Sequence, residues 1–279
     1  MNWPRATSWR GAAAWIVMSA VVLVWVGAPL WTIIINSFKT ERDAALLDLS
    51  LPGEWAVGQN YATVINQGRI ANGLFNTLLY SVCSISIVLL VGSLAAWILA
   101  RSRSRIVRPL YYLAISGVFV PPAIVTTIFV LKILGIYGQQ IGIILFYSAI
   151  YLPVSVFLLT GFMRAIPYDL EEAARVDGLG PLKLYWLIII PLLRPGLITC
   201  FVLLFIAIWN DFIYPFFFLS KTAQWPLTVG LYNFASGQQF TVRWNLVFAH
   251  VVLVSLPAVI VFLLAHRRLI TGFMEGAHK

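Results

Sequence analysis

Charged side chains are scarce in this sequence of 279 residues. They make up 10% of the chain, and only ten of them are acidic, whereas hydrophobic residues make up 61%. A soluble domain of this size would expose apolar patches larger than the roughly 300–600 Å² that is usual for the largest patch on such proteins. The composition therefore excludes a soluble globular protein and indicates a membrane protein.

The sequence also has little that could form a catalytic or metal centre. Its two cysteines, Cys83 and Cys200, lie in apolar runs and show no disulfide or zinc spacing. The three histidines occur near the C-terminal end, with neither an H-E-x-x-H motif nor a paired-acid pattern. There is no G-x-x-x-x-G-K-[ST] motif for ATP. We therefore expect no enzyme, no metal and no cofactor on this chain.

Six apolar segments are long enough to cross roughly 30 Å of hydrocarbon as helices. They span about 13–35, 76–99, 111–134, 141–162, 196–218 and 245–265. The first is longer than the apolar part of a cleaved signal peptide, which favours a retained signal anchor. The sequence thus predicts an all-α membrane protein with six transmembrane helices, forming one domain over residues 1–279.

The basic residues predict the orientation of these helices. If the N-terminus is cytoplasmic, the inner segments carry Arg5, Arg10, Arg101, Arg103, Arg105, Arg108, Arg164, Arg175, Lys183, Arg194, Arg267, Arg268 and Lys279. The outer segments then carry only Lys39, Arg42, Arg69, Lys221 and Arg243, with Lys132 near a span end. This bias predicts that both termini are cytoplasmic. Scattered between apolar runs, the basic residues do not form the continuous stripe of a nucleic-acid-binding protein.

A polar hairpin at residues 163–195 separates the fourth and fifth segments. It carries four of the ten acidic residues. Pro167 suits the first turn of a helix, and Gly178 suits its end, so a short helix is expected at about Pro167–Asp177. A second helix is expected after Gly180-Pro181, with Pro191 and Pro195 bounding the next span. The hairpin could lie on lipid as an amphipathic helix, but its acidic charge disfavours an anionic leaflet and favours a protein partner.

The hairpin sequence also carries a family resemblance. The run Glu172-Ala173-Ala174-x-x-Asp177-Gly178, followed by Pro191-x-x-x-Pro195, resembles the EAA loop of permease subunits in binding-protein-dependent ABC importers. Trp209-Asn210-Asp211-Phe212 and Leu256-Pro257 are similar to the carbohydrate-uptake branch, in particular to the shorter permease of maltose-type systems. The resemblance covers nearly the whole chain.

This resemblance implies a type I ABC importer permease fold in the bacterial cytoplasmic membrane. It implies a coupling helix that contacts a separate ATPase subunit dimer, which would bind ATP and Mg, through Glu171, Glu172, Ala173, Ala174, Asp177 and Gly178. It also implies a second permease subunit and an extracytoplasmic solute-binding protein, for which Asn233, Ser236 and Gly237 are candidate contacts. The tail at Gly272–Lys279 is a candidate second contact to the ATPase.

A candidate path for a sugar-type solute lies near the end of the fifth segment. A carboxylate within a span is costly and usually faces a cavity or a partner, which draws attention to Asp211. The candidate lining residues are Trp209, Asn210, Asp211, Tyr147, Tyr151 and Ser155. A structural role remains the alternative: Asp211 could pair with Lys132 or lie at the outer interface, and the tyrosine stripe could serve packing.

Two other functions remain open from the sequence. One is an ABC importer permease for a non-sugar solute such as glycerol phosphate or a polyol. The other is an ion-coupled secondary transporter, which would ordinarily show intramembrane charges and an inverted repeat. Neither of these features is clear in this sequence.

Overall fold

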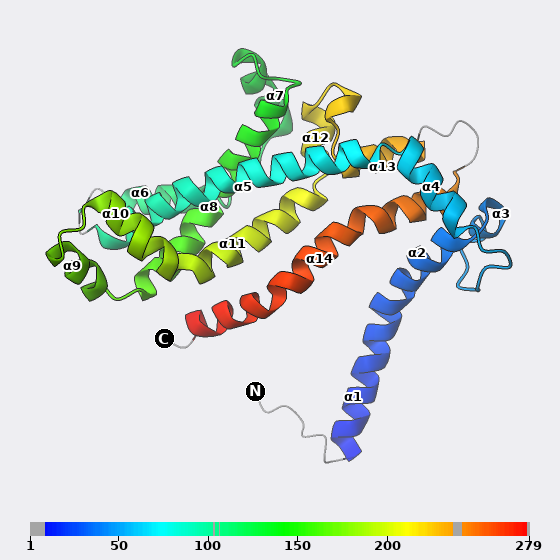
Figure 1. Cartoon of the computed structure of the whole chain (residues 1–279), viewed down its shortest axis with the longest axis horizontal. Coiled ribbons are helices and arrows are strands. Elements are labelled where there is room, and N and C mark those ends of the chain that lie inside the picture. Colours follow the sequence, from blue (N-terminus) through cyan, green and yellow to red (C-terminus); the bar gives the residue numbers. More distant parts are fainter. Residues whose placement is uncertain (1–8, 103, 106, 237–241, 278–279) are drawn as a thin grey trace. The chain divides into compact units, whose positions relative to one another are not determined.

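The computed structural model describes residues 9–102, 104–105, 107–236 and 242–277, and these residues contain helices but no strands (Figure 1). The chain forms two compact units. Unit 1 comprises Met1–Ala71 and Gly230–Leu256, and unit 2 comprises Asn72–Val229 and Pro257–Lys279. The boundaries between them fall within helices α5 (Ile70–Arg101), α13 (Leu227–Ser236) and α14 (Trp244–Ala277).

Unit 1 begins with one long apolar helix. It consists of α1 (Trp9–Val22), a π-helical turn (Leu23–Gly27) and α2 (Ala28–Phe38). A loop containing the short α3 (Glu41–Ala44) leads to α4 (Val57–Gln67). The core of this unit is formed by Val64 of α4 with Leu246 and Ala249 of α14.

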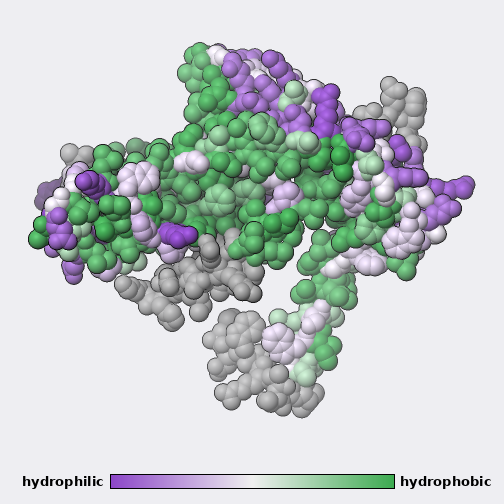
Figure 2. All heavy atoms as spheres, viewed as in Figure 1, coloured by the Kyte–Doolittle hydropathy of each residue, from purple (hydrophilic) through white to green (hydrophobic). Residues whose placement is uncertain are grey.

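Unit 2 contains the remaining helices. In chain order they are α5, α6 (Val107–Ser116), α7 (Ile124–Ile133), α8 (Gln140–Ala165), α9 (Asp169–Val176), α10 (Pro181–Leu184), α11 (Ile190–Asn210) and α12 (Ile213–Phe218). A π-helical turn at Tyr185–Ile189 joins α10 to α11 without a break. Figure 2 shows a largely hydrophobic surface over the long helices of this unit, and a mixture of hydrophilic and hydrophobic residues where α9 and α10 lie.

Five helices of the described chain are long and apolar enough to cross a membrane. They are Gly11–Phe38, Ile70–Arg101, Gln140–Ala165, Pro181–Asn210 and Trp244–Leu264. The sequence predicted a sixth continuous span at 111–134, but this segment is divided into α6 and α7 by the non-helical stretch 117–123. Pro121 and Pro122 explain the interruption, because neither has an amide hydrogen for a helical bond and each restricts the residue before it.

The fifth predicted span also differs from the structure. The helix begins at Pro181 and passes through Pro191 and Pro195, which were expected to bound its entry. The wide π-helical turn directly before Pro191 relieves the crowding that its ring would cause in a regular α-helix. The helix ends at Asn210, and Asp211 separates it from α12, so 196–218 is not one continuous helix.

Small residues allow the central helices of unit 2 to approach closely. Helix α11 packs against α8, where a Cβ atom placed on Gly196 would lie 2.7 Å from Cγ of Phe162. A Cβ on Gly92 of α5 would lie 2.8 Å from Oγ of Ser155 on α8. Both glycines therefore set the distance between neighbouring helices.

We expect Gly196→Ala to destabilise unit 2, because the added methyl group must displace the Phe162 ring from its packed position. Overpacking of this kind costs about 1–3 kcal/mol. Thermal unfolding in detergent would measure this as a lower Tm. Gly161→Ala on α8 is the matched control, since nothing lies within 4 Å of its Cβ position. An unchanged Tm for Gly196→Ala would contradict the proposed close contact.

Candidate functional site

The polar hairpin has the helix–turn–helix form that the sequence predicted. Helix α9 covers Asp169–Val176, and α10 begins at Pro181. Gly178 between them has a φ of 81°, a left-handed conformation that favours glycine. The amide of Gly178 donates to the carbonyl of Arg175, and the amide of Leu179 donates to that of Ala174. These bonds end α9 and turn the chain, as expected for a glycine after a helix.

The side chain of Glu171 points into the protein, although the sequence placed it among the contacts for a partner. It has no exposed surface. One carboxylate oxygen accepts a 2.7 Å bond from Nε of Arg101, and the other accepts a 3.1 Å bond from Nε1 of Trp97. Both donors lie at the last two turns of α5. Glu171 therefore fastens α9 to the end of α5.

Two further contacts strengthen this attachment. The Arg101 guanidinium also donates to the carbonyl of Ile166 at 2.8 Å, just before α9. One turn along α5, the Trp97 ring stacks on Tyr185, with 5.8 Å between ring centres. The Tyr185 hydroxyl and Oγ of Ser93 are 2.7 Å apart. Ser93, Trp97 and Arg101 thus lie along one face of α5 and hold both arms of the hairpin.

The opposite face of the hairpin is exposed. Glu172, Ala173, Asp177 and Gly178 lie on it, whereas Ala174 is buried beside Glu171. Apolar side chains are exposed on the same hairpin: 87% of the Val176 surface and 72% of the Leu182 surface are accessible. The exposed face therefore combines acidic groups, an apolar residue at each arm and the tight turn. This is the chemistry of a surface that binds a protein.

Asp211, the second candidate centre, occupies the break between α11 and α12. Oδ2 of Asp211 accepts a 2.7 Å bond from the Tyr147 hydroxyl of α8. Its Oδ1 accepts a 3.0 Å bond from the amide of Ile213, the first residue of α12. Its backbone carbonyl accepts a 2.7 Å bond from the Thr228 hydroxyl. Asp211 therefore has a clear structural role at this break.

Of the other residues predicted to line the path, only some lie near Asp211. The Tyr147 and Tyr151 rings stack, with centres 6.2 Å apart, so these two lie on the Asp211 side of α8. Trp209 is buried against Phe205, and the Asn210 amide donates to the carbonyl of Ile206 in its own helix. Ser155 is buried in the contact of α8 with α11, where it accepts a bond from the Cys200 thiol.

Lys132, which the sequence offered as a possible partner of Asp211, contacts a different residue. Its ammonium group lies over the Tyr137 ring, 5.2 Å from the ring centre. The ion pairs of the described chain join Lys39 to Asp48, Arg101 and Arg175 to Glu171, and Arg243 to Glu41. None of these pairs includes Asp211.

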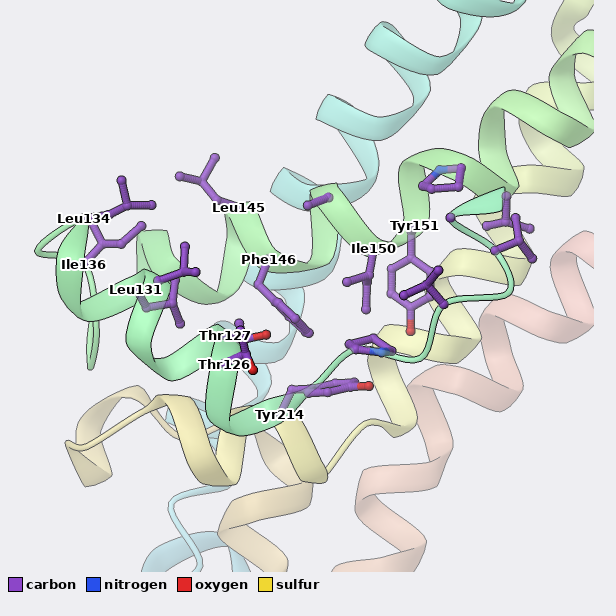
Figure 3. Close-up of a pocket in the computed structure, with 18 residues that line it drawn as sticks. Thr126, Thr127, Leu131, Leu134, Ile136, Leu145, Phe146, Ile150, Tyr151 and Tyr214 are labelled. Atoms are coloured by element: carbon purple, nitrogen blue, oxygen red, sulfur yellow. The ribbon is translucent and has the colours of Figure 1, made fainter. Parts of the chain in front are cut away.

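A pocket of about 920 Å³ lies beside this cluster (Figure 3). Its walls are mainly apolar and come from the 117–122 stretch, α7 and α8. Tyr151 and Tyr214 contribute phenol groups, and Thr126 and Thr127 contribute hydroxyls. An aromatic wall with a few hydroxyl groups can stack on and hydrogen-bond to a polyhydroxylated ring. The sequence predicted Tyr151 but missed Tyr214, whose place at the pocket depends on the break at Asp211.

The predicted contacts for a solute-binding protein lie at the end of α13. Asn233 and Ser236 belong to this helix, and the Ser236 hydroxyl donates to the carbonyl of Tyr232. Gly237 lies outside the described residues.

The segment before α13 is held firmly by α5. The Asn72 and Asn76 amides both donate to the carbonyl of Ala223 at 2.8 Å. The Tyr80 hydroxyl donates to the carbonyl of Gln224 at 2.6 Å, and the amide of Leu227 donates to the Thr77 hydroxyl. These bonds were not predicted from the sequence, although the donors Asn72, Asn76 and Tyr80 recur every four residues along a long apolar helix.

Comparisons with known proteins agree on one family. The family model described as "Binding-protein-dependent transport system inner membrane component" matches residues 88–271. The chain is 30% identical to the diacetylchitobiose uptake system permease protein NgcG of Streptomyces coelicolor, over 98% of this chain and 91% of that protein. It is 29% identical to the melibiose/raffinose/stachyose import permease protein MelC of Bacillus subtilis, over 99% of each.

A solved structure has the same fold. A chain in the crystal structure of a bacterial ABC transporter involved in the import of the acidic polysaccharide alginate superposes with a TM-score of 0.84. The match covers 96% of this chain and 99% of that chain, with 20% sequence identity.

We expect Arg101→Gln to loosen the hairpin, because it removes the shorter ion pair of the buried Glu171 carboxylate and leaves only Arg175, 3.9 Å away. Removing one partner of a buried pair costs about 3–5 kcal/mol, which corresponds to local opening that is roughly 150- to 4,000-fold more frequent. Hydrogen exchange of residues 166–178 in nanodiscs would measure this opening. Arg105→Gln, at an exposed arginine four residues later, should leave the exchange unchanged. Equal protection in both variants would contradict an anchoring role for Glu171.

Proposed function

Because the chain belongs to the family of binding-protein-dependent transport system inner membrane components, we propose that it is the transmembrane permease subunit of an ATP-driven importer. The observation that carries this proposal is the anchored hairpin, whose exposed face lies opposite the buried Glu171. In this proposal the hairpin binds a separate ATPase subunit through Glu172, Ala173, Asp177 and Gly178. Glu171 and Ala174 position these residues from beneath. ATP and Mg bind the ATPase dimer, and this chain performs no hydrolysis.

We propose that the chain crosses the bacterial cytoplasmic membrane six times, with both termini inside. Five helices have the length of a span, and the sixth crossing consists of α6 and α7 with the proline break between them. The excess of basic residues on the proposed inner segments supports this orientation. The hairpin then lies in the cytoplasm and α13 on the outer side. There Asn233, Ser236 and Gly237 are proposed to contact an extracytoplasmic solute-binding protein.

The proposed solute is a sugar or a sugar derivative. The relatives are named for the uptake of diacetylchitobiose and of melibiose, raffinose and stachyose, which supports an oligosaccharide. Within this chain we propose that Tyr147, Tyr151 and Asp211 border the path, together with Tyr214. Trp209, Asn210 and Ser155 then support the helices around it. A second permease subunit is proposed to complete the path.

The proposed mechanism is alternating access. Closure of the ATPase dimer moves the bound hairpin, and the Glu171 attachment transmits this movement to α5. A change at the hairpin can shift the access equilibrium only if the ATPase binds one state more tightly than the other. The stiff hydrogen-bonded attachment of α9 to α5 makes the two elements move together, which is what coupling needs.

A permease for a non-sugar solute, such as glycerol phosphate or a polyol, would use the same hairpin. An ion-coupled secondary transporter would not need an ATPase. Co-purification separates the last case from the proposal: we expect the chain to be isolated with an ATPase subunit, and ATP-independent uptake by this chain alone would rule the proposal out.

We expect Glu172→Lys and Gly178→Asp to abolish ATP-driven uptake in proteoliposomes. The first reverses a charge on the exposed face, and the second adds a charge and a side chain at the left-handed turn. Both variants should insert in the membrane at normal levels, because neither residue packs against the spans. Loss of the protein from the membrane would instead indicate a role in folding.

The matched control is Gly180→Asp. It introduces the same charge two residues away, at a φ of −69° that any residue adopts and with nothing within 4 Å of the Cβ position. Uptake should be largely retained. If Gly180→Asp is as inactive as Gly178→Asp, added charge rather than the turn explains the defect.

We expect Tyr151→Phe to raise the KM for uptake of the solute that the partner binding protein retains. Loss of one hydrogen bond, worth about 1 kcal/mol, corresponds to a change of roughly fivefold. Tyr112→Phe on α6 is the control, because this tyrosine is 60% exposed and does not line the pocket. An unchanged KM for Tyr151→Phe would remove Tyr151 from the path without affecting the coupling proposal.

A further inference from the structure

The segment between α2 and α4 forms a closed loop with an unusual surface. Residue 39 leaves the end of α2, and the amide of Ala56 returns to donate to the carbonyl of Phe38 at 2.8 Å. The Phe38 and Trp55 rings close the same neck, with centres 6.0 Å apart. Residues 39–55 therefore leave and rejoin the helix end at one point.

A buried cation holds the loop in shape. Lys39 has only 1% of its side-chain surface exposed, and its ammonium group donates to the Asp48 carboxylate at 2.5 Å and to the Asp48 carbonyl at 3.2 Å. The bonds from Lys39 and from the Ser50 hydroxyl lower the pKa of Asp48 to about 2. The carboxylate is therefore ionised throughout the physiological range, and the pair persists there.

The loop folds back along α2 instead of projecting from it. The Asn36 amide donates to the carbonyl of Asp48, and Nε1 of Trp31 donates to the carbonyl of Leu49 at 3.1 Å. Trp31 lies seven residues before the end of α2 at Phe38, or about 10 Å along the helix. The backbone of Leu49 therefore lies beside Trp31, about 10 Å back along α2 from its end at Phe38.

That level corresponds to the boundary of the hydrocarbon. The first candidate span, Gly11–Phe38, contains 28 residues, which is about 42 Å of helix against roughly 30 Å of hydrocarbon. Centred in the bilayer, the helix extends about 6 Å beyond the hydrocarbon at each end, and Trp31 lies just inside it. Tryptophan is enriched at this depth.

The loop exposes four leucines, and the backbone of one of them, Leu49, lies beside Trp31. The exposed fractions are 71% for Leu46, 44% for Leu47, 55% for Leu49 and 63% for Leu51, and Trp55 is 63% exposed. The adjoining surface of α2 is also exposed and apolar, with Leu30 at 53% and Ile34 at 42%. The leucines therefore continue an apolar surface that α2 already presents.

We propose that this leucine loop, residues 44–55, is an interfacial membrane anchor that inserts Leu46, Leu47, Leu49 and Leu51 into the lipid at the end of α2. Lipid is the occupant that the geometry favours, because the loop lies beside a helix of which only 6% of the most apolar window is buried. The Lys39–Asp48 pair keeps the loop folded back while its leucines face the acyl chains. The anchor requires that the long helix Gly11–Phe38 spans the bilayer, and it does not depend on the proposed solute, the ATPase or the orientation of the chain.

The test uses single cysteines labelled with the fluorophore NBD in a Cys83→Ser, Cys200→Ser background. Leu46→Cys, Leu49→Cys and Leu51→Cys report on the loop, and Val24→Cys is the lipid-facing reference, since Val24 is 62% exposed on the first span. Gln59→Cys, at an exposed position on α4, is the reference for water. The full chain with its partner subunits is reconstituted in phosphatidylcholine vesicles containing 5-doxyl phosphatidylcholine.

We expect labels at positions 46, 49 and 51 to lose most of their fluorescence to the doxyl lipid and to resist quenching by iodide, as at position 24. The label at position 59 should show the opposite pattern. Quenching of the leucine positions by iodide would place the loop in water and overturn the proposal. Resistance to both quenchers would place the loop against protein, such as a second permease subunit, and would overturn it equally.

Discussion

The position of the hairpin depends on one buried carboxylate. Glu171 has no access to solvent and is bonded to Arg101 and Trp97, so α9 cannot leave α5 without breaking both of these bonds. This attachment also decides which side of α9 faces outward, because Glu172 and Asp177 are then directed away from α5. A partner that binds the exposed face must move α5 together with α9.

Helix α5 is fastened at both of its ends. Its last turns hold the hairpin through Arg101, Trp97 and Ser93, and its first turns hold residues 223–227 through Asn72, Asn76, Thr77 and Tyr80. A helix of 32 residues is about 48 Å long, so the outermost of these contacts, at Asn72 and Arg101, are about 44 Å apart along the helix. The helix between them is unbroken and contains no proline. A displacement at one end therefore reaches the other end without an intervening hinge in α5.

The sequence predicted the helical class, most of the apolar helices and the turn at Gly178, because these features follow from local signals: apolar run length, proline and glycine. The sequence did not predict the features that depend on tertiary contacts. Glu171 and Glu172 are adjacent acids in one motif, and only the position of Arg101, seventy residues away, determines that the first is buried and the second exposed. For the same reason Ala174 is buried and Ala173 is exposed. The continuous helix through Pro191 and Pro195 was missed because a π-helical turn, which has no sequence signature of its own, accommodates the first proline.

The two interruptions of helix in unit 2 indicate which of its surfaces avoids lipid. The 117–123 stretch contributes Gly117, Val118, Val120 and Pro122 to the pocket, and the break at Asp211 places Tyr214 in the same pocket. Backbone groups without helical bonds are tolerated at membrane depth only where protein or water covers them. Both breaks therefore argue that the pocket side of unit 2 faces a partner subunit or a water-filled path. A helical surface without such breaks can face the acyl chains. In the proposed function, the irregular backbone, rather than the hydropathy of the lining, thus marks the side of unit 2 that borders the path.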